Sequence, residues 1–290
     1  MIRSRRLAYA VLSTADVDKQ VRYFERVLGL HRAFSDATRA VLSTQHGLEC
    51  IVLERDGQPP GLKGLAFEIA PSLSLDEARS DLERGGINAV IRPGRTPGID
   101  RVLAFKDPKG TEIELFNAFR FAEGSLGEAG ISPLKLGHVA YSMPSVDAIS
   151  QFYIGALGFR KSDWREGQAM FLRCSTDHHT VNFFRGDPRL HHLAFELKDF
   201  SELVRASDIL ARNNHPLSWG PARHTIGHNC ASYHHNPDGL MIELYAEMDQ
   251  MLDEELGYYD PKPWHEFRPQ RPRAWGPNDS PRNKWIPDAP

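Results

Sequence analysis

The chain has 290 residues, of which 41% are hydrophobic and 25% are charged, and its formal net charge is -3. This length suggests about two domains with a sizeable core, and the small negative charge argues against a nucleic-acid or membrane-surface partner. No apolar run is long enough to predict a transmembrane helix, and the three widely spaced cysteines fit neither a disulfide framework nor a zinc motif, so we expect a reducing, cytoplasmic compartment.

The first half of the chain predicts short strands that alternate with two helices. The apolar side chains of Val17, Val21 and Phe24 recur at helical spacing and share one face. The turn at residues 107–110 (DPKG) joins two strands as a hairpin. We expect strands at residues 7–12, 40–43, 49–53, 65–70, 101–105 and 111–116, and helices at residues 16–30 and 75–84.

The second half repeats this order. Strands are expected at residues 136–142, 170–174, 180–185, 192–197, 230–233 and 240–246, and helices at residues 145–158 and 200–213. Three pairs of positions fix the register between the halves: Tyr9 with His138, Gly64 with His192, and Glu114 with Glu243. Their offsets are 128 or 129 residues, and such a constant spacing indicates an internal duplication.

The second copy alone carries a set of side chains that suits a metal ion. His138, His192 and Glu243 each lie on an apolar strand, and two imidazoles with one carboxylate form the facial triad of non-haem Fe(II) oxygenases. A single histidine on such a strand is more often a core residue than a ligand. The first copy, however, has Tyr9 and Gly64 at the two histidine positions, so the strands themselves do not require imidazoles. We therefore predict a metal site in the second copy and a scaffold role for the first.

His191 is the alternative to His192 as the second histidine ligand. Neighbouring residues of a strand point to opposite faces, so one of the two shares a face with the other ligands. The register of the duplication favours His192. Glu114 survives in the first copy without histidine partners, and we interpret it as a leftover or a hydrogen-bonding residue.

Residues 220–245 (GPARHTIGHNCASYHHNPDGLMIELY) carry a longer motif: a histidine, a tyrosine, an Asn-Pro-Asp-Gly turn and then Glu243. This order resembles the signature of the type I extradiol ring-cleaving dioxygenases of the vicinal oxygen chelate superfamily. The resemblance implies an α+β fold of two tandem domains, each built from paired βαβββ modules as in glyoxalase and bleomycin-resistance proteins. The corresponding boundaries are a metal-free domain at residues 1–125, a catalytic domain at residues 132–248 and a C-terminal arm at residues 249–290.

By the same resemblance, three residues of the second half take catalytic roles. His178 matches the acid/base histidine, and its neighbour His179 is the alternative. His224 matches the histidine that hydrogen-bonds the substrate hydroxyl, with His228 as a weaker alternative. Tyr233 matches the tyrosine that holds the deprotonated catechol oxygen.

Trp219 and Met170 are expected to line the substrate pocket together with His224 and Tyr233. The implied ion is Fe(II), with Mn(II) as the alternative because the same ligand set accepts either. The implied reaction opens a catechol ring beside its two hydroxyls and incorporates both atoms of O2, in the catabolism of aromatic compounds. We expect a homo-oligomer with no nucleic-acid partner and no membrane partner.

Three other functions are compatible with such a fold. A metal-dependent, glyoxalase-like isomerase or lyase takes its ligands from paired modules, and the single equipped copy and Tyr233 argue against it. A metal-free small-molecule-binding protein of the drug-resistance kind would not need three convergent ligands. A hydroxyphenylpyruvate-type dioxygenase shares the triad but requires a 2-oxo acid, and His178 and Tyr233 disfavour it.

The segment from residue 249 on changes composition. Eight prolines and three tryptophans lie from residue 261 on. Proline excludes helix and sheet, whereas tryptophan is unusual in disordered tails. We predict an ordered arm that covers the catalytic mouth or a neighbouring subunit.

Overall fold

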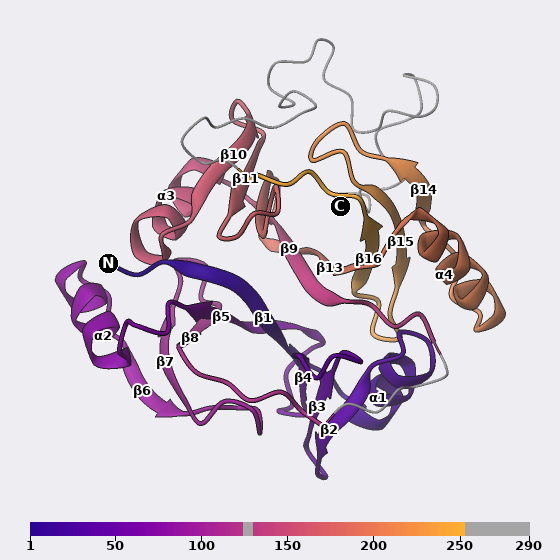
Figure 1. Cartoon of the computed structure of the whole chain (residues 1–290), viewed down its shortest axis with the longest axis horizontal. Helices are drawn as coiled ribbons and strands as arrows, with labels where there is room; N and C mark the ends of the chain where they lie inside the picture. Colours follow the sequence, from indigo (N-terminus) through magenta and orange to yellow (C-terminus); the bar gives the residue numbers. More distant parts are fainter. Residues whose placement is uncertain (124–129, 253–290) are drawn as a thin grey trace. The chain divides into compact units, whose positions relative to one another are not determined.

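Two eight-stranded sheets organise the described part of the chain. The computed structural model describes residues 1–123 and 130–252 (Figure 1). The chain divides into two compact units. The first comprises Met1–Leu136 and Gln151–Phe159, and the second comprises Gly137–Ser150 and the chain from Arg160 on. Because the two sheets have the same strand order, each can be described as one copy of the duplicated fold.

The first sheet has the strand order β2-β3-β4-β1-β5-β8-β7-β6. β1 and β5 pair antiparallel at its centre, while β1 with β4 and β5 with β8 run parallel. Helix α1 contacts β2, β3 and β4, and helix α2 contacts β6 and β7. The bounds are β1 Ser4–Ser13, α1 Val17–Arg26, β2 His31–Ser35, β3 Arg39–Ser43, β4 Glu49–Glu54, β5 Gly61–Ile69, α2 Leu75–Arg84, β6 Val90–Pro93, β7 Arg101–Lys106 and β8 Glu112–Phe116.

The second sheet repeats this arrangement with the order β10-β11-β12-β9-β13-β16-β15-β14. Its central strands β9, β13 and β16 are neighbours, and helix α4 contacts β15 and β16. The bounds are β9 Lys135–Met143, α3 Val146–Leu157, β10 Arg160–Arg165, β11 Ala169–Arg173, β12 Val181–Arg185, β13 Arg189–Glu196, α4 Phe200–Arg212, β14 Trp219–Arg223, β15 Cys230–His235 and β16 Met241–Ala246.

Side-chain caps fix the start of three helices. Asp16 and Asp199 each accept a hydrogen bond from a backbone N–H in the first turn of the helix that follows. Ser74 and Glu77 form a capping box at the start of α2. These caps satisfy N–H groups that have no partner within the helix, and they set the rotation at which each apolar stripe faces its sheet.

The α+β architecture of tandem βαβββ modules is confirmed. The predicted elements were wrong in omitting four strands, which are β2, β6, β10 and β14. Each of these follows a helix directly, and each forms an edge of its sheet. An edge strand needs little apolar alternation because it has one neighbour and a solvated side, as the polar strand Arg160–Arg165 illustrates.

The C-terminal arm and the domain boundaries remain predictions. The expected arm at residues 249–290 lies outside the described residues from residue 253 on, and the domain boundaries remain a prediction. Among the residues that are described, no helix has both the length and the apolar character needed to cross a membrane.

Candidate metal centre

Three neighbouring strands of the second sheet each contribute one metal-binding side chain. β9, β13 and β16 carry His138, His192 and Glu243 (Figure 1). Ala194 on β13 lies directly opposite Glu243, so His192, two residues earlier, shares the face of the carboxylate. All three side chains are buried, and within residues 1–123 and 130–252 they form the one group of His, Cys, Asp or Glu residues whose ligand atoms converge.

The three ligand atoms form a nearly equilateral triangle. Nε2 of His138 lies 3.2 Å from Nε2 of His192 and 3.0 Å from Oε2 of Glu243. Nε2 of His192 lies 2.9 Å from the same carboxylate oxygen. Ligands that sit about 2.1 Å from a metal ion and at right angles to each other are about 3.0 Å apart. The triangle therefore fits one face of an octahedral divalent ion and leaves the opposite face for other ligands.

The charges of the site also suit a cation. Burial disfavours the charge of Glu243, but the interactions with His138 and His192 outweigh burial and hold the pKa of this carboxyl well below its usual value. Burial lowers the pKa of His138, so its imidazole is neutral at pH 7 and presents a lone pair. Imidazoles coordinate a metal ion in their neutral form, so two of them with one carboxylate would bring a single negative charge, and this buried donor set fits a divalent metal ion.

Two further side chains contact the ligands from outside the triangle. Nδ1 of His191 lies 2.7 Å from Nδ1 of His192, and this contact leaves Nε2 of His192 directed at the other ligands. Asn229 donates a hydrogen bond from Nδ2 to Oε1 of Glu243 at 3.0 Å. His191 lies outside the convergent group, which contains His192. Sequence analysis did not identify Asn229, because it lies in a loop with no periodic pattern.

Tyr233, His224 and Trp219 form a chain of contacts beside Glu243. Tyr233 lies directly opposite Glu243 on neighbouring strands, and Trp219 lies opposite Tyr233 on β14. The Tyr233 hydroxyl is 3.0 Å from Nε2 of His224, and the Trp219 ring stacks on the His224 imidazole with 4.8 Å between centroids. Burial and the Glu243 charge raise the pKa of Tyr233 well above its usual value, so the hydroxyl remains a donor at neutral pH.

His178 and His179 lie together in the loop before β12. The His179 ring contacts His138 with 4.5 Å between centroids, and Nδ1 of His178 lies 2.9 Å from Nδ1 of His179. Gly227 approaches both rings, since a Cβ there would lie 3.2 Å from an atom of each, and its φ of +64° also favours glycine. The ring that contacts a metal ligand is therefore that of His179, and both histidines remain candidates for the acid/base role.

Met170 and His228 are two further residues that the sequence suggested for the site. Met170 pairs with Trp164 and Phe183 in the sheet, while its neighbour Phe171 contacts the rings of the two loop histidines. Nδ1 of His228 lies 2.6 Å from a carboxylate oxygen of Asp249. The side chain of β11 that faces His178 and His179 is thus Phe171, and strand alternation directs Met170 to the opposite face.

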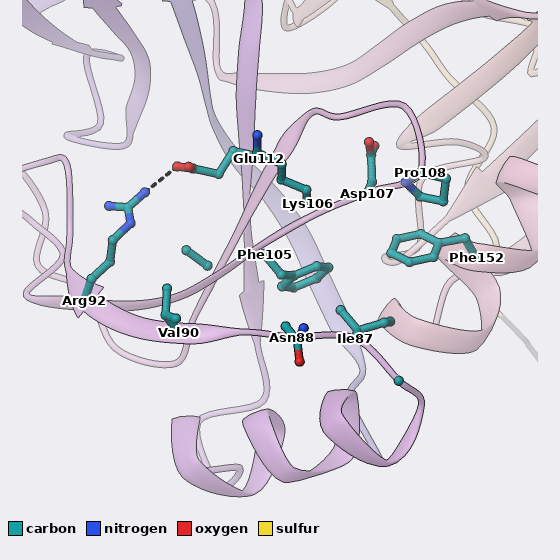
Figure 2. A pocket seen from close by; sticks show the side chains of 12 residues that line it. Ile87, Asn88, Val90, Arg92, Phe105, Lys106, Asp107, Pro108, Glu112 and Phe152 are labelled. Atoms are coloured by element: carbon teal, nitrogen blue, oxygen red, sulfur yellow. Dashed lines mark hydrogen bonds and ion pairs between the residues drawn. The ribbon is translucent and has the colours of Figure 1, made fainter.

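The first unit has a pocket near the positions that match the aromatic pair. Val90 and Ala104 lie 129 residues before Trp219 and Tyr233, and they oppose each other on β6 and β7. Both line a pocket of about 560 Å³ (Figure 2). The rest of its lining combines the rings of Phe105 and Phe152 with polar and charged side chains. The first copy therefore has neither the tryptophan nor the tyrosine of the second copy at these two positions.

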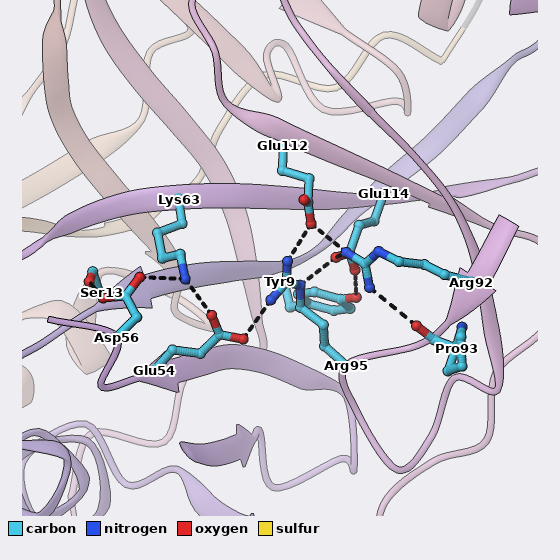
Figure 3. Close-up of polar contacts among 10 residues, drawn as sticks. All are labelled: Tyr9, Ser13, Glu54, Asp56, Lys63, Arg92, Pro93, Arg95, Glu112 and Glu114. Carbon is cyan, nitrogen blue, oxygen red and sulfur yellow. Dashed lines mark hydrogen bonds and ion pairs between the residues drawn. The ribbon is translucent and has the colours of Figure 1, made fainter. Parts of the chain in front are cut away.

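An ion-pair network takes the place of the metal ligands in the first unit (Figure 3). Glu114, the buried counterpart of Glu243, accepts a hydrogen bond from the Tyr9 hydroxyl at Oε2. Its Oε1 lies 2.5 Å from Nη2 of Arg92 and 2.5 Å from Nε of Arg95. Both carboxylate oxygens thus have donors from the same chain, which agrees with the hydrogen-bonding interpretation of Glu114.

Arg95 makes more ion pairs than either of the other cations of this network, Arg92 and Lys63. Besides Glu114 it pairs with Glu54 and Glu112, and Lys63 pairs with Glu54 and Asp56 (Figure 3). Arg95 lies 129 residues before His224, so it occupies the matching place in the first copy. A guanidinium therefore neutralises the carboxylate that a metal ion would neutralise in the second copy.

The sequence profile of the Glyoxalase/Bleomycin resistance protein/Dioxygenase superfamily matches this chain twice, at residues 6–115 and 135–244. This chain belongs to that superfamily. The two matches are offset by 129 residues, as the duplication requires. The superfamily indicated by the C-terminal motif is therefore confirmed.

Ring-cleaving dioxygenases are among its relatives. The chain is 26% identical over 260 residues to 3-methylcatechol 2,3-dioxygenase of Pseudomonas putida, which covers 82% of this chain and 88% of that one. A variant of homoprotocatechuate 2,3-dioxygenase from Brevibacterium fuscum has a TM-score of 0.78 and 25% identity, with 88% of this chain and 74% of that one covered. The Mn(II)-bound glyoxalase from Novosphingobium aromaticivorans has a TM-score of 0.78 and 26% identity, with 86% and 84% covered. The resemblance to extradiol ring-cleaving dioxygenases is thus confirmed at the level of homologues.

Proposed function

We propose that this protein is an extradiol dioxygenase that uses Fe(II), with Mn(II) as the alternative ion. The reaction opens a catecholic ring beside its two hydroxyls and incorporates both atoms of O2. The observation that carries the proposal is the buried triangle of His138, His192 and Glu243, with Tyr233 opposite Glu243 on the neighbouring strand. Relatives named as catechol dioxygenases support the same reaction.

The ligand set suits an anionic diol. When bound, the metal ion would supply positive charge and coordination positions for ligands from outside the protein. His138 and His192 would hold it as neutral donors and Glu243 as an anionic one, so a divalent ion would keep one net positive charge. Because all three ligands are buried, that charge is poorly screened on the protein side and favours an ionised hydroxyl.

Tyr233 and His224 are proposed to orient the diol. The protonated Tyr233 hydroxyl can donate to a substrate oxygen, and the imidazole of His224, 3.0 Å away, offers a second polar contact. The stacked ring of Trp219 holds the plane of this imidazole. Two polar groups on one side of the site would distinguish the two hydroxyls of the diol, which a one-sided ring cleavage requires.

His178 is proposed as the group that accepts a proton from the diol and returns one during ring opening. Imidazole is suited to both transfers near neutral pH. His179 is the alternative, since its ring contacts His138. The two residues are adjacent, and a variant of each can separate their roles.

Oxygen consumption tests the proposed reaction. The protein would be loaded with Fe(II) without air and then given a panel of catechols while O2 uptake and visible absorbance are recorded. We expect one O2 consumed per diol and a coloured ring-opened product. His192→Ala should lose bound iron and O2 uptake together, because one ligand of the triangle is gone. His215→Ala, which removes a partly exposed histidine of the same unit, should retain both.

Two results would contradict the proposal in different ways. Full activity of His192→Ala would mean that the ligands are misassigned. Iron binding by the wild type without O2 uptake on any diol would reject the reaction but keep the metal centre.

The second candidate function is that of a metal-dependent isomerase, because the Mn(II)-bound glyoxalase matches the fold as well as the dioxygenase does. An isomerase consumes no O2, so turnover without air would favour it.

A further inference from the structure

Asn229 contacts the carboxylate of the metal centre from the side away from the histidines. Its Nδ2 donates to Oε1 of Glu243 at 3.0 Å, whereas Oε2 of that carboxylate faces His138 and His192. The side chain of Asn229 is buried, with a relative exposure of 1%. Oε1 therefore receives the hydrogen bond of the amide, with Nε2 of His224 farther away at 3.9 Å, while Oε2 faces the two imidazoles of the triangle.

The orientation of the amide is determined by chemistry. A carboxylate only accepts hydrogen bonds, so the NH2 group of Asn229, and not its carbonyl oxygen, must face Glu243. Oδ1 of Asn229 is then buried without a hydrogen-bond partner among the described residues. The hydrogen bond to the charged carboxylate therefore fixes which end of the amide faces Glu243.

The backbone anchors this amide to the substrate side of the site. The carbonyl oxygen of Asn229 accepts a hydrogen bond from the backbone N–H of His224 at 2.9 Å. The loop that presents His224 to Tyr233 is therefore the loop that presents Asn229 to Glu243. In the first copy the matching residue is Asp100, which instead pairs with Arg120 at the surface.

We propose that Asn229 is a positioning residue of the metal centre, which holds Glu243 so that it presents one oxygen, Oε2, to the ion. Outer partners of this kind orient metal ligands, and their loss typically weakens metal binding by about 10–100-fold. The proposal rests on the metal centre of the proposed function and not on the reaction catalysed there.

Mn(II) binding to the full chain tests this role without turnover. The dissociation constant would be measured by competition with a chelator, and the EPR spectrum of bound Mn(II) would report the ligand arrangement. Asn229→Leu keeps the branched shape and removes the donor, and Asn229→Ala is a second variant in case the first packs poorly. We expect the dissociation constant to rise about 10–100-fold and the EPR spectrum to change.

Asn236→Leu is the matched control. Asn236 is also a buried asparagine of the second unit, but its Oδ1 accepts backbone N–H groups of Asp238 and Leu240 in the turn before β16. This control should lower the melting temperature of the metal-free protein and leave Mn(II) affinity within about twofold. A dissociation constant within twofold of wild type in both Asn229 variants would overturn the proposal, as would an equal loss of affinity in Asn236→Leu. Failure of the proposed reaction would appear separately, as absent O2 uptake by a wild-type protein that binds the metal.

Discussion

The two adjacent histidines before β12 differ in what they contact. His179 touches His138, and burial lowers its pKa well below the usual value for histidine. Nε2 of His178 lies 3.8 Å from a carboxylate oxygen of Asp163, on the other side of the pair. A residue in contact with a ligand tends to shape the metal site, whereas a residue one step away is freer to exchange protons with a substrate. The pair therefore offers a test of which histidine does which.

We predict that His178→Ala keeps the metal and slows turnover by about 10²-fold, as expected for loss of a general acid/base. His179→Ala, the matched variant, should weaken metal binding more than it slows the fully loaded enzyme. Metal content by elemental analysis and turnover at saturating metal separate the two effects. The opposite pattern, with iron lost from His178→Ala, would exchange the two assignments.

Strand edges explain which elements were missed from the sequence. The central strands are buried on both sides and their apolar runs are clear, so β1, β5, β9 and β13 were predicted within a few residues. The four omitted strands are edges, where polar side chains are tolerated. Alternation reports burial, and an edge strand has too little burial to produce it.

The residues of the site also differ in whether the sequence predicts them, according to whether they lie on central strands or in loops. The metal ligands lie on central strands, so comparing the two copies was enough to select His138, His192 and Glu243. Asn229 reaches Glu243 through the path of a loop, and no periodicity encodes that path. Arg95 was missed for the same reason, since its contacts with three carboxylates depend on where the loop after β6 places the guanidinium.

The Arg95 network gives a prediction about the first unit. Glu114 is 1% exposed, so removal of its main cation leaves a buried carboxylate with fewer partners. We expect Arg95→Met to lower the free energy of unfolding by about 2–3 kcal/mol, less than for a fully buried pair because Arg95 retains some contact with solvent. Adding Glu114→Gln should recover part of this loss, because it removes a buried charge that has only Arg92 left as a cationic partner.

Arg120→Met is the comparison for this effect. Arg120 pairs with Asp100, and both side chains are exposed, so we expect no measurable loss of stability. Urea unfolding of the wild type and these three variants would give the comparison. Equal stabilities of Arg95→Met and the wild type would mean that the network adds little to the first unit.

At the scale of the whole molecule, the two copies surround matching glutamates with different side chains. In the second copy a carboxylate converges with two imidazoles, and in the first copy a carboxylate is neutralised by arginines of the same chain. The two glutamates are both buried on equivalent strands, but only Glu114 has arginine side chains beside it, whereas Glu243 has two imidazoles. The chain should therefore bind one metal ion, and the ion should stabilise the second unit alone.

Glu243→Gln and Glu114→Gln, at matched positions of the two copies, test this asymmetry. Adding Mn(II) at 100 times its dissociation constant should stabilise the wild type by about 2.7 kcal/mol and raise its melting temperature by several degrees. Glu243→Gln should abolish this increase, because it weakens an anionic ligand. Glu114→Gln should lower the melting temperature without metal, because it leaves two arginines with less negative charge, and should keep the increase on adding Mn(II). Scanning calorimetry resolves the two units if they unfold separately. If the increase in melting temperature on adding Mn(II) persists in Glu243→Gln and is lost in Glu114→Gln, the metal binds in the first copy and the prediction is wrong.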